Sequence, residues 1–165
     1  MNFNFSETVF NDFLGESKVW IYQSERPFNA KEITSINESI KNFTQQWTAH
    51  NQQLKATGCV IEDRFILLMV DETQAGASGC SIDKSVHFIQ QLQDQFKTNL
   101  FNRLLLSYQA DDGIKTISLS DLKNEVAMGA LTASTIIFNT TIQTKNQFET
   151  EWMQAAGESW LKSRM

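Results

Sequence analysis

Hydrophobic residues recur every three or four positions in two long stretches of the chain, which predicts two amphipathic helices. The first helix begins after Asn29, has Glu32 three positions later as a capping-box partner, and extends as far as His50. We expect the imidazole of His50 to interact with the last carbonyl groups of this helix. The second helix begins at Ser81 as its N-cap. The positions expected on its buried face are Ile82, Val86, Ile89, Leu92 and Phe96.

Runs rich in β-branched and aromatic residues, separated by turn residues, predict strands. The run 65–70 is apolar throughout, which is typical of a central strand covered on both faces. Shorter helices are predicted over 6–14, 119–128 and 145–153. The predicted strands are 18–23, 54–61, 64–70, 100–109, 114–118 and 134–140.

The order of these elements predicts the fold class. Residues 18–109 have the order β-α-β-β-α-β of ferredoxin-like folds, and residues 110–165 add a C-terminal β-α-β-α extension. Residues 1–17 form an N-terminal docking helix with its apolar face on Val9, Phe10, Phe13 and Leu14. We therefore predict a single α+β domain over 1–165, a sandwich with helices mainly on one face of an antiparallel or mixed sheet. Whether the extension joins the main sheet is left open.

The composition narrows the functional classes. The chain has 165 residues, 41% of them hydrophobic, with 12 Phe and 4 Trp, which is ample material for one core. A net charge of −5 gives no electrostatic reason to bind nucleic acid or an anionic membrane surface. The first seven residues do not form a secretory signal, and the longest apolar run is too short to span a bilayer. Cys59 and Cys80 are expected to be reduced thiols of a cytoplasmic protein.

The stretch from Gln74 to Phe96 is the part of the chain whose residues indicate more than packing. No bulky side chain follows Gln74 in the loop 74–79, so its backbone can approach a ligand closely. Free N–H groups at a helix start can hold a phosphate or carboxylate, although glycine-rich turns before helices also occur without ligands. The residues expected to bind a small anion are Gly76, Ser78, Gly79, Ser81 and Lys84.

An alternative function is thiol chemistry at Cys80. The residue lies just before the predicted helix cap, where the field of the helix favours a thiolate. A histidine would serve as base, with Asp83 orienting it, so the candidate catalytic set is Cys80, His50 and Asp83. His87 is the weaker base because it lies two turns further along the same helix. The two histidines and two cysteines have no metal-ligand spacing, and no metal or other cofactor is predicted.

Several segments resemble those of a family of short bacterial proteins, and the resemblance covers nearly the whole chain. Members of that family are often labelled "ABC transporter ATPase". The family has no established activity, so the resemblance implies no catalytic residues. The segments that carry it are VWIYQS at 19–24, WTAH at 47–50, GCSID at 79–83, FIQQL at 88–92 and ESW at 158–160.

The motifs argue against the ATPase label. The run 65–72, ending in Asp-Glu, is similar to a Walker B strand, and Lys84 followed by a serine is similar to the end of a phosphate loop. Where the phosphate loop requires glycines, however, this chain has Asp83 and Ser78. One strand also cannot serve both motifs. The sequence therefore predicts a non-catalytic binding or interaction protein, whose ligand is a small anion or a protein partner, and does not predict its oligomeric state.

Overall fold

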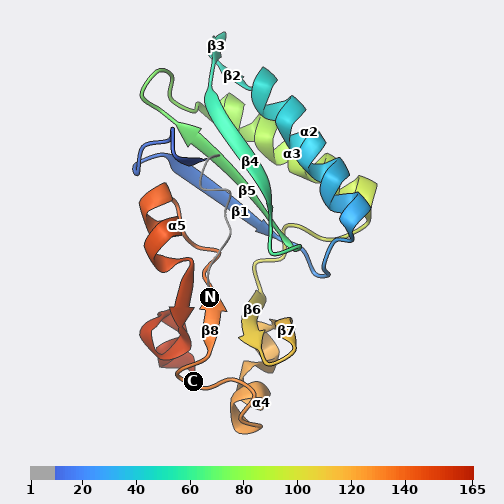
Figure 1. The fold of residues 1–165 in the computed structure, drawn as a ribbon, viewed down its shortest axis with the longest axis vertical. Coiled ribbons are helices and arrows are strands. Elements are labelled where there is room, and N and C mark those ends of the chain that lie inside the picture. The colour runs from blue at the N-terminus through green and yellow to red at the C-terminus, as the bar shows by residue number, and fades with distance from the viewer. Residues whose placement is uncertain (1–9) are drawn as a thin grey trace.

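The computed structural model describes residues 10–165 and has two larger antiparallel β-sheets and a two-stranded hairpin (Figure 1). The first sheet has three strands in the order β1-β5-β4, and the second has four in the order β7-β6-β8-β9. The strands of the first sheet are β1 (Lys18–Gln23), β4 (Lys55–Ile61) and β5 (Phe65–Asp71). Those of the second are β6 (Leu105–Ala110), β7 (Gly113–Ser118), β8 (Ile136–Phe138) and β9 (Met153–Ala155).

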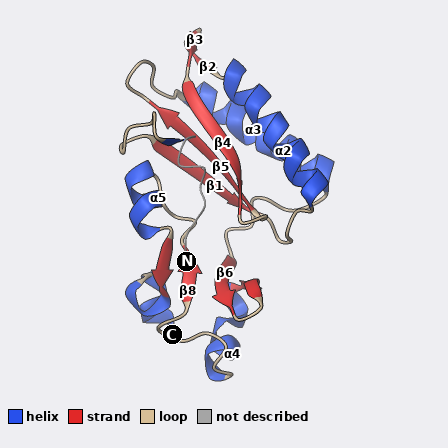
Figure 2. Ribbon diagram, viewed as in Figure 1, coloured by secondary structure: helices blue, strands red, loops and turns tan. Residues whose placement is uncertain are grey.

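Two long helices, α2 (Ala30–Gln46) and α3 (Gly79–Phe96), cover one face of the first sheet (Figure 2). The short helix α5 (Lys145–Glu151) contributes to the core on the opposite face, and α4 (Leu122–Ala127) packs in the second sheet's core. A small hairpin, β2 (Thr48–Ala49) with β3 (Gln52–Gln53), follows α2. The 3₁₀ turns are Leu119–Asp121, Ala156–Glu158 and Trp160–Arg164. The predicted α+β class is confirmed.

Strand β5 is buried on both faces, as its unbroken apolar sequence predicts. All seven of its residues are buried, and successive side chains point to opposite faces. Ile66 and Leu68 pack with the helices, whereas Phe65, Leu67 and Met69 pack with residues of the C-terminal part. The partners on the helix side include Ile36, Ile40, Ile89 and Leu92, and those on the other side include Phe10, Phe138, Phe148 and Trp152.

The first sheet has a split β-α-β arrangement. Strands β1 and β4 each pair antiparallel with β5, so β1 and β4 run in the same direction on either side of it. The expected fourth strand does not join them, because β6 pairs with β7 and β8 in the second sheet. The ferredoxin-like order is therefore not confirmed. Besides packing against β5, the C-terminal extension pairs with the edge of β1, where Val19 N–H donates to Gln143 O over 2.9 Å beside an isolated bridge between Lys18 and Thr144.

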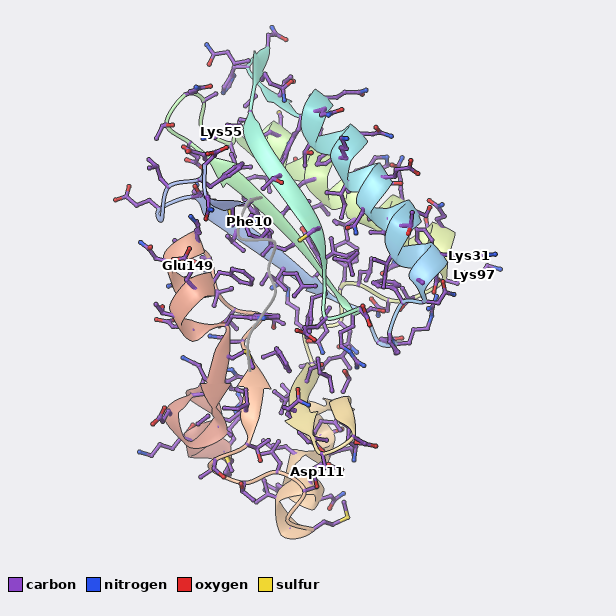
Figure 3. All side chains as sticks on the ribbon, in the orientation of Figure 1. Phe10, Lys31, Lys55, Lys97, Asp111 and Glu149 are labelled. Carbon is purple, nitrogen blue, oxygen red and sulfur yellow. The ribbon has the colours of Figure 1, made fainter. Side chains whose placement is uncertain are left out.

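Several shorter predictions differ from the structure at their ends. Residues 6–9 of the helix predicted over 6–14 lie outside the described residues. Phe10 and Phe13 are buried, and Phe10 lies between the sheet and α5 (Figure 3), but Leu14 is 53% exposed because the helix ends at once in a turn. The closing helix stops at Glu151, because the next residues form β9 against β8. The two-residue strands β2 and β3 and the strand β9 were not predicted, being too short to show a periodicity.

The second sheet has its own core and one paired buried carboxylate. The Tyr108 hydroxyl donates to Glu125 over 2.5 Å, and the Lys115 ammonium lies 3.0 Å from the same carboxylate. These hydrogen bonds lower the pKa of Glu125, and burial raises the pKa of Tyr108. The cluster fastens α4 to β6 and β7.

Over residues 10–165, no helix combines the length and the apolar character needed to cross a membrane.

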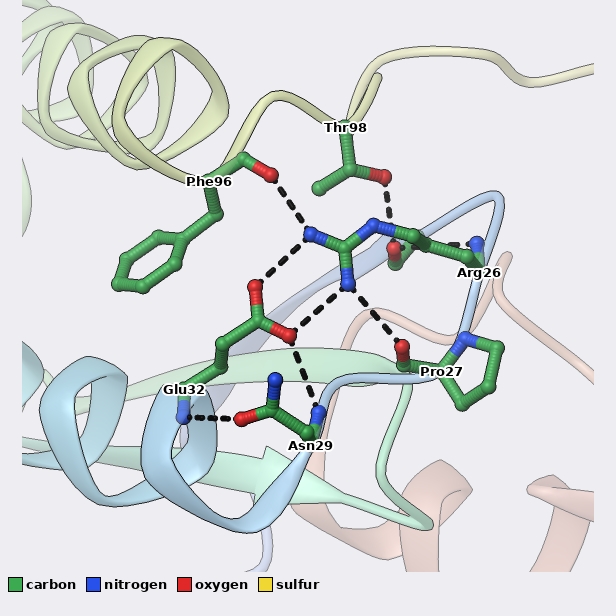
Figure 4. A network of polar contacts seen from close by, with 7 residues as sticks. Arg26, Pro27, Asn29, Glu32, Phe96 and Thr98 are labelled. Atoms are coloured by element: carbon green, nitrogen blue, oxygen red, sulfur yellow. Dashed lines mark hydrogen bonds and ion pairs between the residues drawn. The ribbon is translucent and has the colours of Figure 1, made fainter.

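The start of α2 is tied to the end of α3 by Arg26 and Glu32 (Figure 4). The Arg26 guanidinium donates to both Glu32 oxygens, at 2.9 and 2.8 Å, and to Phe96 O at 2.7 Å. The predicted capping box is confirmed, since Glu32 N–H donates to Asn29 Oδ1 and Asn29 N–H donates to Glu32 Oε1. The hydrogen bonds from Arg26, and next that from Asn29 N–H, lower the pKa of Glu32 to about 2.

The Arg26–Glu32 contact predicts a dependence of stability on pH. Because the folded-state pKa of Glu32 lies below its ordinary value of 4.5, its stabilisation is complete above that pH and is lost as the pH falls toward about 2. We expect Glu32→Gln to lower the free energy of unfolding by about 1–2 kcal/mol at neutral pH, and the difference from wild type to shrink in acid. Urea denaturation across that range measures it. Glu38→Gln, on the exposed side of α2, is the control, and an equal loss there would contradict the assignment.

Gly58 permits α2 to approach β4 closely. A Cβ atom at this position would lie 2.9 Å from Ile40 Cγ2 and from Leu68 Cδ2, and would overlap Leu67 O. We expect Gly58→Ala to lower the free energy of unfolding by about 1–3 kcal/mol, as overpacking of a closed core does. Gly79→Ala is the control, because a Cβ there meets nothing within 4 Å and the residue begins a helix. Urea unfolding followed by tryptophan fluorescence compares them, and equal stabilities would refute the close approach.

Candidate functional site

Helix α3 begins one turn earlier than predicted. Its N-cap is Ser78, whose hydroxyl accepts from Ser81 N–H at 3.1 Å, while Ser78 N–H donates to Ser81 Oγ at 2.7 Å. The prediction of Ser81 as N-cap is therefore wrong, because this reciprocal serine pair satisfies the helix start three residues sooner. Asp83 consequently lies beyond the first turn, and Cys80 lies inside the helix instead of before it. Ser81 is buried and faces the core.

This capping leaves few donors for an anion at the loop. With Ser81 N–H bound to Ser78, the N–H groups of Gly79 and Cys80 are the ones that remain at the helix start. The position of Gly76 faces the Glu72 carboxylate, whose Oε2 would lie 3.5 Å from a Cβ there. That carboxylate, paired with Lys18 at 3.0 Å, repels an anion from the loop itself. Only the Gly79–Cys80 side of the predicted site remains suited to negative charge.

A groove of about 560 Å³ lies between the end of α2 and the first half of α3. Its floor is aromatic, since the Phe43 and Phe88 rings stack with centroids 4.4 Å apart and Trp47 lies 5.0 Å from Phe43. Trp47 is fixed in place because its indole N–H donates to Ser81 O at 2.8 Å. The polar groups on its walls are Gln46, Cys80, Asp83, Lys84, His87 and Gln91.

The structure brings three of the predicted site residues together in this groove. Cys80, Asp83 and Lys84 are three and four positions apart on α3 and therefore share one face of the helix, with His87 one turn further. The other predicted residues Gly76, Ser78, Gly79 and Ser81 do not line the groove.

His50 is not where the sequence predicts it. Helix α2 ends at Gln46, Trp47 is already extended, and His50 lies in the turn of the β2–β3 hairpin with a φ of 51°. The expected contact of His50 with the last helical carbonyls is therefore wrong. The helix ends early because Trp47 O accepts from Leu54 N–H at 2.9 Å and from the Gln53 side chain at 3.1 Å, which turns the chain back into the hairpin.

The thiol site lacks the geometry of a catalytic set. His87 lies seven residues beyond Cys80 on the same helix, a separation of about 10 Å along the axis, and its ring contacts Gln91 at 3.5 Å. Within residues 10–165, neither histidine forms a hydrogen bond with Cys80, and His50 does not line the groove. The arrangement presents an exposed thiol beside a carboxylate and an ammonium group, without an assembled cysteine–histidine pair.

The Walker B resemblance has a structural explanation. Asp71, at the end of β5, is buried, and its Oδ1 accepts from the N–H and the hydroxyl of Thr73 at 2.9 and 2.7 Å. These hydrogen bonds lower the pKa of Asp71, and Lys55 lies 3.5 Å from its other oxygen. The aspartate thus holds the turn after β5. The part of the chain that the structure describes contains no group of three or more His, Cys, Asp or Glu residues arranged to hold a metal ion.

Comparisons with known proteins identify no relative. No protein-family model, curated protein or solved structure matches the chain.

The sequence reasoning missed the aromatic floor of the groove. Phe88 is not among the positions that the sequence places on the buried face of its helix. The buried face of α3 is rotated from the predicted one toward Ser81, Ser85 and Phe88, with Ile82 and Val86 only half-buried. The small serines let α3 lie close to the sheet and to Trp47. The available signal was the spacing of Ser81, Ser85, Phe88 and Leu92, which is as helical as that of the apolar set.

The two cysteines differ in environment, which predicts different reactivity. Cys80 is exposed, whereas Cys59 is half-buried on β4 and desolvation raises its pKa to about 11. We expect iodoacetamide at mildly alkaline pH to alkylate Cys80 at least about tenfold faster than Cys59 in the folded protein. Intact mass with peptide mapping measures both rates, and in denaturing urea the two should converge. Equal rates in the native state would contradict the burial of Cys59.

Proposed function

We propose that this protein is a cytoplasmic, non-catalytic binding protein whose ligand is a small organic anion held in the α2–α3 groove. The observation that carries the proposal is the combination, in one groove, of an aromatic floor with Lys84 and Cys80 near the start of α3. Stacked Phe43 and Phe88 provide an apolar surface for a flat ligand body. The Lys84 ammonium and the N–H groups of Gly79 and Cys80 would attract its negative group. Asp83, on the same wall, disfavours a second negative charge there.

The proposed scaffold is a ferredoxin-like module that lacks its fourth strand, within a single domain of α+β class. The split β-α-β sheet and two helices on one face support this, and the pairing of 143–144 beside β1 takes part of the missing strand's place. Membership of the bacterial family that the sequence resembles is part of the same proposal. We expect no NTPase activity, because the Asp71 carboxylate is engaged by Thr73 and α3 begins with a serine capping box. The net charge of −5 supports no nucleic-acid partner and no anionic membrane surface.

The second candidate function is thiol chemistry at Cys80. It is favoured by the exposure of this cysteine and by its place in the groove beside Asp83 and Lys84. It requires a base that approaches only when substrate binds, since His87 is two turns away. Cys80→Ser separates the two functions, because a binding protein keeps its affinity with this variant and a thiol enzyme loses all activity.

The proposed function predicts which ligands bind and which residue holds them. Benzoate, phenyl phosphate and inorganic phosphate form the probe set, titrated into ¹⁵N-labelled protein. We expect the aromatic anions to shift the amides of Gly79, Cys80 and Lys84, and inorganic phosphate to bind more weakly because it cannot use the aromatic floor. Lys84→Glu should lower the affinity for the aromatic anions about tenfold or more, because it reverses the charge at this position.

Lys123→Glu, an exposed charge reversal on α4 away from the groove, is the matched control and should leave the affinities unchanged. Equal effects of the two variants, or amide shifts that avoid the start of α3, would refute the groove as the binding site.

A further inference from the structure

Strand β1 has an open edge within a second cleft, away from the α2–α3 groove. At the start of the strand its outer edge is paired, since Val19 N–H donates to Gln143 O and Lys145 N–H donates to Ser17 O, both at 2.9 Å. Because N–H and C=O groups alternate in direction along a strand, those of Ile21 also point outward. On this outer side, neither the N–H nor the C=O group of Ile21 has a hydrogen-bond partner among residues 10–165.

The cleft beside this edge is large enough for a short extended peptide. It has a volume of about 560 Å³ and a polar lining that includes Glu16, Arg103, Thr140 and Thr141. An adjoining hollow continues it along the strand and shares Ile21, Tyr22, Arg103 and Thr140. The walls come from residues 100–105, which lead from α3 to β6, and from residues 140–144, which lead from β8 to α5.

Both ends of the open edge are closed. At the start of β1 the edge is occupied by residues 143–145. At its end the connection to the second sheet crosses the strand and is fastened to it, because Ser24 Oγ lies 2.8 Å from Thr98 Oγ1 and Gln23 Nε2 donates to Ser107 Oγ at 2.7 Å. Between these points the edge offers about 10 Å, the length of three extended residues. A passing strand does not fit, so the partner chain must end inside the cleft.

Charge selects which end of a chain fits. Arg103 lines both the cleft and the adjoining hollow together with Ile21 and Tyr22, which places it near the end of β1. Within the described part of the chain it has no ion pair or hydrogen bond, whereas Glu16 lies at the opposite end. A peptide parallel to β1 brings its terminal carboxylate to Arg103. An antiparallel peptide would bring its terminal ammonium group to Arg103, where two positive charges repel each other.

A second copy of this protein is a poor occupant of the same edge. Its own β1 edge lies at the floor of an identical cleft, between the same two walls, so two such edges cannot approach to hydrogen-bonding distance. A chain terminus has no such walls and enters freely.

We propose that the β1 cleft binds the extended carboxyl terminus of a partner protein, which adds as a short parallel strand to Ile21 and places its terminal carboxylate on Arg103. Pairing to an exposed strand edge supplies affinity through main-chain hydrogen bonds, and the side pockets supply selectivity. The site is independent of the α2–α3 groove, so either proposal can fail without the other.

The test starts from a library of hexapeptides displayed with free carboxyl termini. The tightest-binding sequence is synthesised as the free acid and as the terminal amide, and both are titrated into the full-length ¹⁵N-labelled protein. We expect the free-acid peptide to shift the signal of the Ile21 backbone N–H group. The amidated peptide should bind at least about tenfold more weakly. Arg103→Ala should lower the affinity for the free-acid peptide by a comparable factor and leave the affinity for the amidated peptide almost unchanged. Arg103→Lys should restore part of the affinity for the free acid. Lys123→Ala is the control with unchanged affinity.

Four results would overturn the proposal. They are the recovery of no saturable binder, equal affinity of acid and amide, an Arg103→Ala variant that binds like wild type, and shifts that leave Ile21 unaffected. Two measurements without peptide identify another occupant. A change of the Ile21 signal with protein concentration would identify a second copy, and a change on deletion of residues 1–9 would identify the chain's own N-terminal segment. Either result would also overturn the proposal that the carboxyl terminus of a partner protein occupies the cleft.

Discussion

The structure depends on the burial of β5 from both sides. Its seven residues are buried, and each face supports a different core, one with α2 and α3 and the other with α5 and β8. A strand covered on both faces buries apolar area on each of them, so β5 contributes hydrophobic free energy to both cores. Both proposed binding sites lie at the margins of this arrangement, where the covering elements end.

The α2–α3 groove is formed where α2 stops. Trp47 turns out of the helix, is held by its indole N–H on Ser81 O, and packs against Phe43, so the end of α2 and the start of α3 are fixed relative to each other. The opposite ends of the same helices are joined by Arg26, Glu32 and Phe96 O. The groove walls are therefore set by contacts at both ends of the helix pair, which suits a preformed binding surface better than one that closes on its ligand.

The β1 cleft exists because the fourth strand of a split β-α-β sheet is absent. Residues 98–105 lead from α3 into the second sheet. Beside them, hydrogen bonds run from Gln23 to Ser107 and from Arg64 to Thr116, and another joins Ser107 and Thr116. These polar contacts tie the two sheets together beside β1 while leaving Ile21 unpaired. An exposed strand edge is usually protected against chance pairing, and here residues 100–105 and 140–144 provide the protection by restricting access.

The local periodicities by themselves determined most elements of this protein. The long helices, the central apolar strand, the β6–β7 hairpin and the Asn29–Glu32 capping box follow from interactions within a few residues, which a sequence displays directly. Of the candidate site, Asp83 and Lys84 were predicted to lie on one helix for the same reason, whereas Cys80 joins them on the helix because α3 begins after Ser78. The Ser78 cap is a contact with Ser81 three residues away, so it is also local, although the sequence analysis placed the cap at Ser81. What only the tertiary structure decided were the separate second sheet, the early end of α2 that removed His50, and the aromatic floor of the groove. Each of these depends on contacts between residues far apart in the chain, such as Trp47 with Ser81 and β6 with β8, whose free energies no local pattern encodes.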